Sequence, residues 1–240
     1  VFKNIFQSIP PINSQLHFGS RLVIKEEYLY ASIGERGKGM IAQDPTQHPG
    51  SIIRIFKNGL IPKINPHFIN KTNWLPEIYQ IGLRNPQGLE LSPLDNQIYT
   101  TNHGAMGGDF FGKVFFGGNY GWKKLGWGGK NYIGTEIGPQ WKKGYNKAIY
   151  YWTPSIGISS LIIYKGKEFP EWNGSAIIGS LKYKTLYKVN FISNKKNPEV
   201  SKIIKNSLGR IRDLEVHPMN GKIYAVNRKF LWLIEKANNH

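Results

Sequence analysis

The feature of this sequence that most constrains its fold is a recurring pair of short strands, in a chain with almost no helical periodicity. Short apolar or alternating runs end at Gly, Pro, Asn or Asp, and four times one run turns back into a second run that ends in small or polar residues. Repeated strand clusters of this kind are typical of a β-propeller, whose blades are small antiparallel sheets. The sequence therefore predicts an all-β, propeller-like protein, with residues 1–240 in one domain. The second runs contain Tyr30-Ala31-Ser32, Tyr99-Thr100-Thr101, Ile178-Gly179-Ser180 and Tyr224-Ala225-Val226.

The strand clusters are irregularly spaced, which indicates that long loops interrupt the blades. The largest interruption is the segment 102–148, which is rich in Gly and Trp, and we expect it to be a long loop insertion. Loops of this kind lie on one face of a propeller and usually carry its function.

Composition removes several other classes of protein. The chain has no Cys, which excludes disulfide scaffolds, Cys-ligated metal sites and thiol catalysis. It has no apolar run of the ~18 residues that a membrane-spanning helix needs, so we expect no membrane span. The 27 Gly and 14 Pro residues disfavour a helical bundle, because both residue types are poor helix formers.

The chain is strongly basic, with 32 Lys and Arg against 15 Asp and Glu and a net charge of +17. The basic residues are scattered, and no continuous basic helix or Arg-rich tract occurs. This pattern favours a solvated Lys-rich surface and predicts no nucleic-acid partner. The other interpretation is a basic module for nucleic acid or acidic polysaccharide, which predicts binding that collapses as salt is added.

Several short strings carry more specific information through their order. In chain order they are His17-Phe18-Gly19-Ser20-Arg21-Leu22, Ala42-Gln43-Asp44, Leu83-Arg84-Asn85-Pro86-Gln87-Gly88, Asn102-His103-Gly104-Ala105-Met106-Gly107-Gly108-Asp109, Asn119-Tyr120-Gly121-Trp122, Tyr151-Trp152-Thr153-Pro154-Ser155-Ile156, Phe169-Pro170-Glu171-Trp172-Asn173-Gly174, Ser180-Leu181-Lys182 and Gly209-Arg210-Ile211-Arg212-Asp213. From about Gln15 to the C-terminus, this ordered set resembles the soluble sugar dehydrogenases that use pyrroloquinoline quinone (PQQ), the glucose/sorbosone dehydrogenase family.

The resemblance implies a six-bladed propeller, with about four blades represented here, and with PQQ and Ca²⁺ at the top of its central channel. PQQ bears three carboxylates, so its site needs fixed cations. Arg210 and Arg212 match the family's cofactor-binding string, and residues spaced i and i+2 project to the same side of a strand. Lys182 matches the family's cofactor-binding lysine. Arg84 and Asn85 match the pair placed over the reactive carbonyl, where Arg84 would stabilise developing negative charge. The alternative for each cation is a role in linking the blades.

The resemblance also implies that the loop His103–Asp109 presents the backbone carbonyls of Gly104 and Ala105 to calcium, which prefers oxygen ligands. Two residues depart from the family pattern. Ala105 stands where the family has proline, and Phe110 replaces the acidic residue that usually follows Asp109. The first change loosens the loop and the second removes a negative charge. A Gly-rich surface loop without a metal is the alternative.

Aromatic and histidine residues complete the list of candidates. Tyr150 and Trp152 are predicted substrate contacts because flat rings stack on sugars, with packing in the blade core as the alternative, and Trp122 is predicted to be a core residue. In the family, a histidine takes the proton of the sugar's anomeric hydroxyl. We expect that histidine to lie in a segment before residue 1, and we expect His17 to be structural.

The resemblance therefore predicts an exported, periplasmic enzyme that oxidises the anomeric carbon of an aldose to a lactone with hydride transfer to PQQ, and then passes electrons to an acceptor. This chain alone is expected to hold most of the cofactor site without the catalytic base. The alternative is a non-catalytic propeller that binds a carbohydrate or a protein partner. The substitutions at Ala105 and Phe110 favour the alternative, whereas the retained cofactor-binding residues favour the enzyme.

Overall fold

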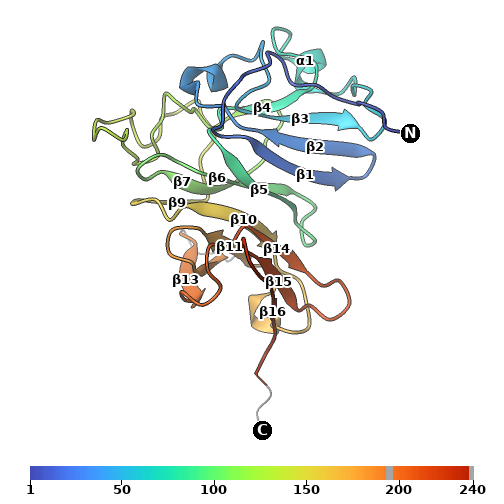
Figure 1. Cartoon of the computed structure of the whole chain (residues 1–240). Coiled ribbons are helices and arrows are strands. Elements are labelled where there is room, and N and C mark those ends of the chain that lie inside the picture. The colour runs from blue at the N-terminus through green and yellow to red at the C-terminus, as the bar shows by residue number, and fades with distance from the viewer. Residues whose placement is uncertain (193–196, 238–240) are drawn as a thin grey trace.

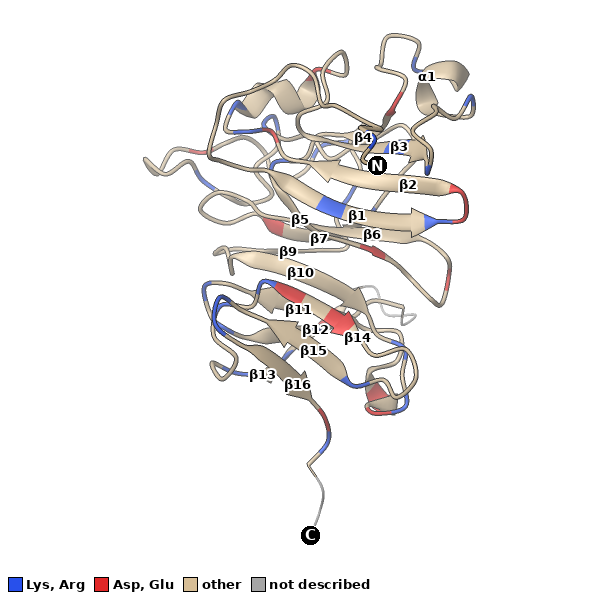
Figure 2. Cartoon of the chain, turned by 45° about the vertical axis from the view of Figure 1, so that its right-hand side comes forward, with Lys and Arg blue, Asp and Glu red and all other residues tan. Residues whose placement is uncertain are grey.

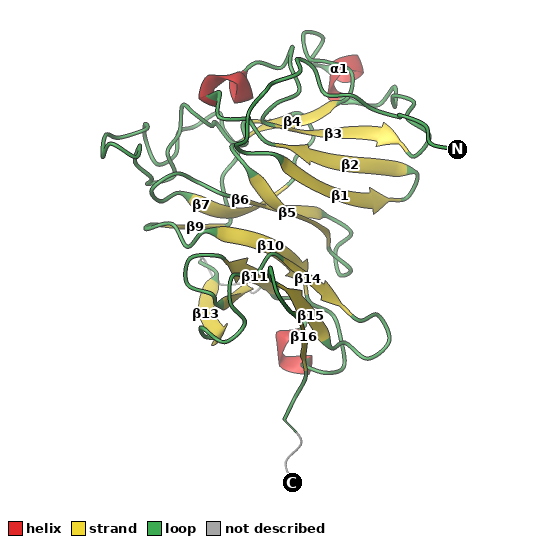
Figure 3. Ribbon diagram, in the orientation of Figure 1, coloured by secondary structure: helices red, strands yellow, loops and turns green. Residues whose placement is uncertain are grey.

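The computed structural model of the chain describes residues 1–192 and 197–237, and most of its regular structure is β-strand (Figure 1). Within these ranges the helical segments are α1 (Pro66–Ile69) and two 3₁₀ turns at Gly39–Gln43 and Pro170–Trp172 (Figure 3). Helices this short cannot cross a bilayer, and none in the described ranges is long enough to do so.

The strands form four sheets that follow one another along the chain (Figure 1). The first contains β1 (Gly19–Lys25), β2 (Tyr28–Ile33), β3 (Ser51–Phe56) and β4 (Ile78–Ile81), with β8 (Gly118–Asn119) parallel to β4. The second contains β5 (Pro86–Leu91), β6 (Ile98–Asn102), β7 (Asp109–Lys113) and β9 (Tyr150–Trp152). The third contains β10 (Ile158–Ile163), β11 (Ala176–Ser180), β12 (Leu186–Asn190) and β13 (Glu199–Ile204). The fourth contains β14 (Asp213–Val216), β15 (Ile223–Val226) and β16 (Leu231–Ile234).

The first strands of successive sheets lie next to one another, β1 beside β5, β5 beside β10 and β10 beside β14. Strand β10 is buried along its whole length, so its sequence, Ile-Ser-Ser-Leu-Ile-Ile, shows no alternation of apolar and polar residues, and its two serines are buried with it. Gly88 permits the close approach of β5 to β10, because a Cβ at this position would lie 2.7 Å from Cβ of Leu161. Antiparallel sheets stacked around their first strands are the blades of a propeller.

The hydrophobic core lies between the sheets and forms three main clusters. The first joins the first and second sheets around Phe110 and Tyr120, and the second joins the second and third sheets around Phe111 and Ile158. The third joins the third and fourth sheets around Ile177. Adjacent Phe110 and Phe111 thus enter different clusters, because successive residues of a strand point to opposite faces of its sheet.

The predicted all-β propeller architecture is confirmed, with a difference in the segment 102–148. This segment, predicted to be a long loop, contains β7 and β8, and only its later part is free of strands. Strands β4, β9 and β13 were also not predicted. These are short or outer strands, whose pattern is weak because fewer of their residues face another sheet.

Candidate active site

The candidate site is built from the connections at one end of the four sheets. In an antiparallel sheet, the connection that enters the first strand and the one between the second and third strands lie at the same end. Repeating this order in every sheet brings residues distant in sequence to one face of the molecule. Two cavities lie there, and both are lined by Ala105 of the β6–β7 connection. The residues that these connections bring to the cavities include His17, Glu35, Arg84, His103, Ser155, Lys182 and Arg210.

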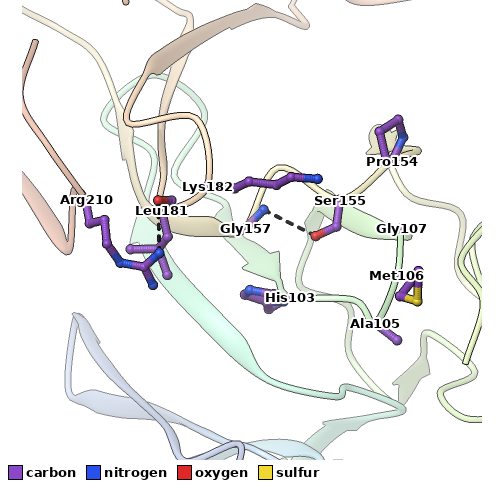
Figure 4. Close-up of a pocket in the computed structure, with 10 residues that line it drawn as sticks. All are labelled: His103, Ala105, Met106, Gly107, Pro154, Ser155, Gly157, Leu181, Lys182 and Arg210. Atoms are coloured by element: carbon purple, nitrogen blue, oxygen red, sulfur yellow. Dashed lines mark hydrogen bonds between the residues drawn. The ribbon is translucent and has the colours of Figure 1, made fainter. Parts of the chain in front are cut away.

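The first cavity, which we call the Lys182 cavity, has a volume of about 350 Å³ and is shown in Figure 4. Arg210 and Lys182 approach it from the third and fourth sheets, and His103, Ala105 and Met106 line its other side. The Nη1 atom of Arg210 donates to the carbonyl of Leu181 at 3.2 Å. Within the described residues, neither Arg210 nor Lys182 forms an ion pair with a carboxylate. The cavity therefore presents two cations that are available to an anion.

Arg212, the third predicted cofactor-binding cation, does not line this cavity but lies near Arg210, which does. Burial, together with repulsion from Arg210 and Arg228, lowers the pKa of its guanidinium. Its main chain links two sheets, because Arg212 N donates to the carbonyl of Val226 and its own carbonyl accepts from Nη2 of Arg21 at 2.7 Å. Arg210 of the Lys182 cavity thus lies in a positively charged neighbourhood that includes Arg212.

The second cavity, which we call the Arg84 cavity, has a volume of about 430 Å³. Arg84 itself is 4% exposed and lies over the ring of Trp122, with 5.4 Å between its Cζ atom and the ring centroid. Its Nη1 donates to the carbonyl of His103 at 3.1 Å, and its Nη2 donates to the hydroxyl of Tyr132 at 3.3 Å. No carboxylate in the described ranges forms an ion pair with this guanidinium. Trp122 is buried as predicted, and it also lines the cavity.

His17 and Glu35 form a hydrogen-bonded pair in the wall of the Arg84 cavity. Burial would raise the pKa of Glu35, but hydrogen bonds from His17 and from the Gly39 N–H, with the nearby Arg84 charge, hold it below its usual value. The pair depends on Gly34, because a Cβ at that position would overlap the carbonyl of His17. Glu35 is thus held as a buried carboxylate that fixes the imidazole ring.

The segment 103–105 contributes to the lining of both cavities. The carbonyl of His103 accepts from Arg84, while the imidazole lines the Lys182 cavity. Asp109 is fully buried and supports the segment, because its Oδ1 accepts from Gly104 N at 2.8 Å. The Gly104 carbonyl, one of the predicted calcium ligands, accepts from Nδ1 of His103 at 3.0 Å. Among the described residues, no group of three or more His, Asp or Glu side chains could hold a metal ion.

Three predicted site residues lie elsewhere. Asn85 follows Arg84, but its Oδ1 accepts from Gly19 N at 3.2 Å and from Gln87 Nε2 at 2.9 Å, which joins the first and second sheets. Tyr150 and Trp152, the predicted substrate contacts, lie on β9 with 4.7 Å between their ring centroids. They belong to the cluster between the second and third sheets, and neither lines the two cavities. In this structure they are therefore core residues, because β9 turns them toward the third sheet.

Sequence reasoning missed His17, Glu35 and Tyr132 as cavity residues. The signal for the first two was present, since His17 precedes the first strand of its sheet and Glu35 follows the second. Arg84 and His103 occupy the corresponding places in the next sheet. Tyr132 gave no such signal, because it lies in the long β8–β9 connection, whose path the strand pattern does not specify.

The fold and these cavities define a β-propeller with a polar, largely cationic site at the loop end of its blades. The chain matches the model of the Glucose / Sorbosone dehydrogenase family over residues 1–229, and it belongs to that family.

Known proteins show the same relationship. The aldose sugar dehydrogenase YliI of Escherichia coli is 34% identical over 230 residues, which cover 94% of this chain and 61% of that protein. A crystal structure of a glucose dehydrogenase superposes with a TM-score of 0.90 at 29% identity, covering 98% of this chain and 69% of the other. The PQQ-bound aldose sugar dehydrogenase of Streptomyces coelicolor shares the fold, with a TM-score of 0.69 at 20% identity and coverage of 89% and 57%. The chain thus spans less than two thirds of the length of the E. coli relative.

Proposed function

We propose that this chain forms the redox site of a quinone-dependent dehydrogenase that oxidises the anomeric carbon of an aldose to a lactone. The observation that carries the proposal is the position of the two cavities on either side of Ala105, one with a His17–Glu35 pair and buried Arg84, the other with Lys182 and Arg210. A base beside a cationic cavity suits a reaction in which an alcohol loses a proton and a hydride.

The donor set of the Lys182 cavity fits PQQ. PQQ has three carboxylates, which need cations. The cavity offers Lys182 and Arg210, neither of which has a carboxylate partner in the described ranges, and Arg212 lies near Arg210. When bound, PQQ supplies the hydride acceptor. We propose that the buried guanidinium of Arg84, in the adjoining Arg84 cavity, stabilises negative charge on an oxygen, and that Asn85 assists by holding the backbone next to Arg84.

We propose His17 as the general base, in place of a histidine before residue 1. Because the Glu35 carboxylate is an acceptor, Nδ1 of His17 donates to it and Nε2 is left to take the proton of the anomeric hydroxyl. Arg84 lines the same cavity and holds positive charge near the oxygen that loses this proton. The pair thus supplies the base that removes this proton, and Arg84 stabilises the charge that remains.

We propose calcium as a second cofactor, bound by the carbonyls of Gly104 and Ala105. Calcium takes about six to eight oxygen ligands, and the described side chains offer no acidic cluster to supply them. The proposal therefore requires the cofactor and water to complete the shell, and it predicts that calcium binds tightly only together with PQQ. We further propose, on family grounds, a periplasmic location and a separate electron acceptor.

The test replaces His17 in the chain loaded with PQQ and calcium and measures aldose-dependent reduction of an acceptor dye. His17→Gln should lower the rate by about 10²–10⁴-fold, the usual contribution of a general base, with PQQ affinity unchanged. The matched control is His217→Gln, because His217 lies at the β14–β15 turn and lines neither cavity. If the His17→Gln variant reduced the dye as fast as the unmodified chain, the result would contradict the role of His17 as the general base.

One observation favours the alternative, a non-catalytic sugar-binding propeller. Phe110 stands where the family has an acidic residue. It is 1% exposed and packs on Tyr120 with 4.6 Å between ring centroids, so no ligand can reach it and the position offers no charge to a cofactor or metal. That alternative predicts sugar binding without dye reduction in either the unmodified chain or the variants.

A further inference from the structure

Tyr132 lines the Arg84 cavity although most of its side chain is exposed. Tyr132 is 71% exposed, although its hydroxyl accepts a hydrogen bond from the buried guanidinium of Arg84 at 3.3 Å. Most of its ring thus faces solvent while its polar end reaches into the cavity wall. A large apolar ring left in water at a cavity entrance is a surface that a ligand can cover.

The connection that carries Tyr132 is joined to the β6–β7 connection, which lines both cavities. Lys130 and Met106 exchange two backbone hydrogen bonds of 3.1 and 3.2 Å, which join the β8–β9 connection to the β6–β7 connection. Lys130 Nζ also lies 3.2 Å from Oε1 of Glu136, and Asn131 N donates to the carbonyl of Thr135 at 2.8 Å. The tip bearing Tyr132 is therefore a closed turn on a fixed base.

The other residues of the cavity indicate what Tyr132 would contact. The cavity wall holds the His17–Glu35 pair, Arg84 and Trp122, which together offer hydrogen-bonding groups and an aromatic surface. A pyranose has the matching properties, because its ring presents C–H faces that pack on aromatic rings and hydroxyls that hydrogen-bond to guanidinium and phenol groups. A small neutral sugar also fits a cavity of about 430 Å³.

We propose that Tyr132 is a substrate-binding residue that covers one face of the aldose in the Arg84 cavity and sets its selectivity. This inference rests on the proposed function and deepens it. The ring of Tyr132 supplies the larger part of the contact, and its hydroxyl keeps Arg84 in place until a sugar hydroxyl joins the same network. Tyr132 takes no part in proton or hydride transfer, so it acts on binding and not on the chemical step.

The test compares Tyr132→Ala, Tyr132→Phe and Ile133→Ala with the unmodified chain. Ile133 is the matched control, because it is the neighbouring residue of the same turn, is 85% exposed and does not line the cavity. Glucose, xylose and maltose are titrated into each protein by calorimetry, and PQQ is titrated separately by tryptophan fluorescence. Thermal unfolding checks that all four proteins are folded to the same extent.

Tyr132→Ala should weaken sugar binding by about ten-fold or more, and Tyr132→Phe by about two- to three-fold, while Ile133→Ala should match the unmodified chain. The ratio of affinities for glucose and maltose should change in Tyr132→Ala, and PQQ affinity should stay constant throughout. Unchanged sugar affinity in Tyr132→Ala overturns the inference, as does a chain that binds PQQ but no sugar. If the unmodified chain bound sugar but not PQQ while Tyr132→Ala lost sugar binding, that result would contradict the redox function and support the role of Tyr132.

Discussion

At the scale of single residues, the candidate site depends on two buried charges that do not form a direct ion pair. Glu35 N donates to the carbonyl of Arg84 at 2.8 Å, which fixes the two backbones together, while the side chains use separate partners. The carboxylate of Glu35 accepts from His17 and Gly39, and the guanidinium of Arg84 donates to His103 and Tyr132. Each charge is satisfied by hydrogen bonds, so Arg84 keeps its positive charge for a ligand.

The lowered pKa of Glu35 predicts a pH-dependent contribution to stability. A carboxyl whose pKa is lower in the folded than in the unfolded chain stabilises the fold above its unfolded value of 4.5, and this contribution disappears as the pH falls through the folded pKa. Glu35→Gln should therefore lower the free energy of unfolding by about 1.5–3 kcal/mol at pH 7. The difference from the unmodified chain should shrink toward pH 3 in urea titrations. A difference that stays constant with pH would contradict the ionised state of Glu35.

Sequence reasoning at this scale succeeded where a side chain belongs to a specific string and failed where its role depends on a partner. Arg84, Lys182 and Arg210 line the cavities, as expected for ligand-binding cations. His17 also belongs to such a string and precedes a first strand, but its role becomes visible only when the β2–β3 connection brings Glu35 to it. Tyr150 and Trp152 show the converse, since an aromatic residue has the same sequence pattern in a core and in a binding site.

At the scale of elements, the first strands of the sheets carry charged residues of both signs, with a blue segment on β1 and red segments on β14 (Figure 2). Arg21 of β1 reaches β14, where its Nη1 lies 2.6 Å from Oδ1 of Asp213. Glu90 of β5 has no such partner among residues 1–192 and 197–237. Burial, with repulsion from Glu215 and Asp213 of β14, raises its pKa to about 8.

Glu90 should therefore make the fold less stable as the pH rises. A carboxyl whose pKa is higher in the folded chain stabilises the fold below its unfolded pKa of 4.5, and this contribution is lost between pH 4.5 and about 8. Glu90→Gln should be more stable than the unmodified chain at pH 8.5 and lose this advantage by pH 5, as measured by chemical unfolding. Glu27→Gln is the control, because Glu27 is 78% exposed. Equal pH dependence in Glu90→Gln and the unmodified chain would contradict the raised pKa.

The packing between sheets gives a second prediction for the elements. Phe111 of β7 is fully buried, with its ring centroid 5.7 Å from that of Tyr99 and 5.1 Å from that of Phe191. Phe111→Ala should lower the free energy of unfolding by about 3–5 kcal/mol, because it leaves a cavity between the second and third sheets.

The control for this prediction is Phe230→Ala, at a side chain that is 56% exposed, which should change the free energy of unfolding by less than about 0.5 kcal/mol. Chemical unfolding of both variants measures the difference. Equal losses in the two variants would contradict the packing of β7 between the sheets.

At the scale of the whole molecule, the repeated strand pairs were enough to predict the propeller. The inner strands β1, β5, β10 and β14 were found from the sequence, because each is a short run closed by turn residues and followed by a second strand. The segment 102–148 was harder, because β7 contains only Asp109–Lys113 between two irregular connections. The predicted fold was enough to place the loops together on one face. It did not predict that this face holds two cavities, because they depend on the path of the β6–β7 connection.

A cofactor site in the Lys182 cavity can be tested by titrating the chain with PQQ in the presence of calcium and following its tryptophan fluorescence. The unmodified chain should bind saturably, and the Lys182→Gln, Arg210→Gln double variant should bind about 10²-fold more weakly or worse, because it loses two charge-assisted contacts. Lys57→Gln with Lys229→Gln, which removes the same charge from exposed positions outside both cavities, should bind like the unmodified chain. Equal affinity in both double variants, or no binding by the folded unmodified chain, would contradict the claim that the Lys182 cavity is a cofactor site.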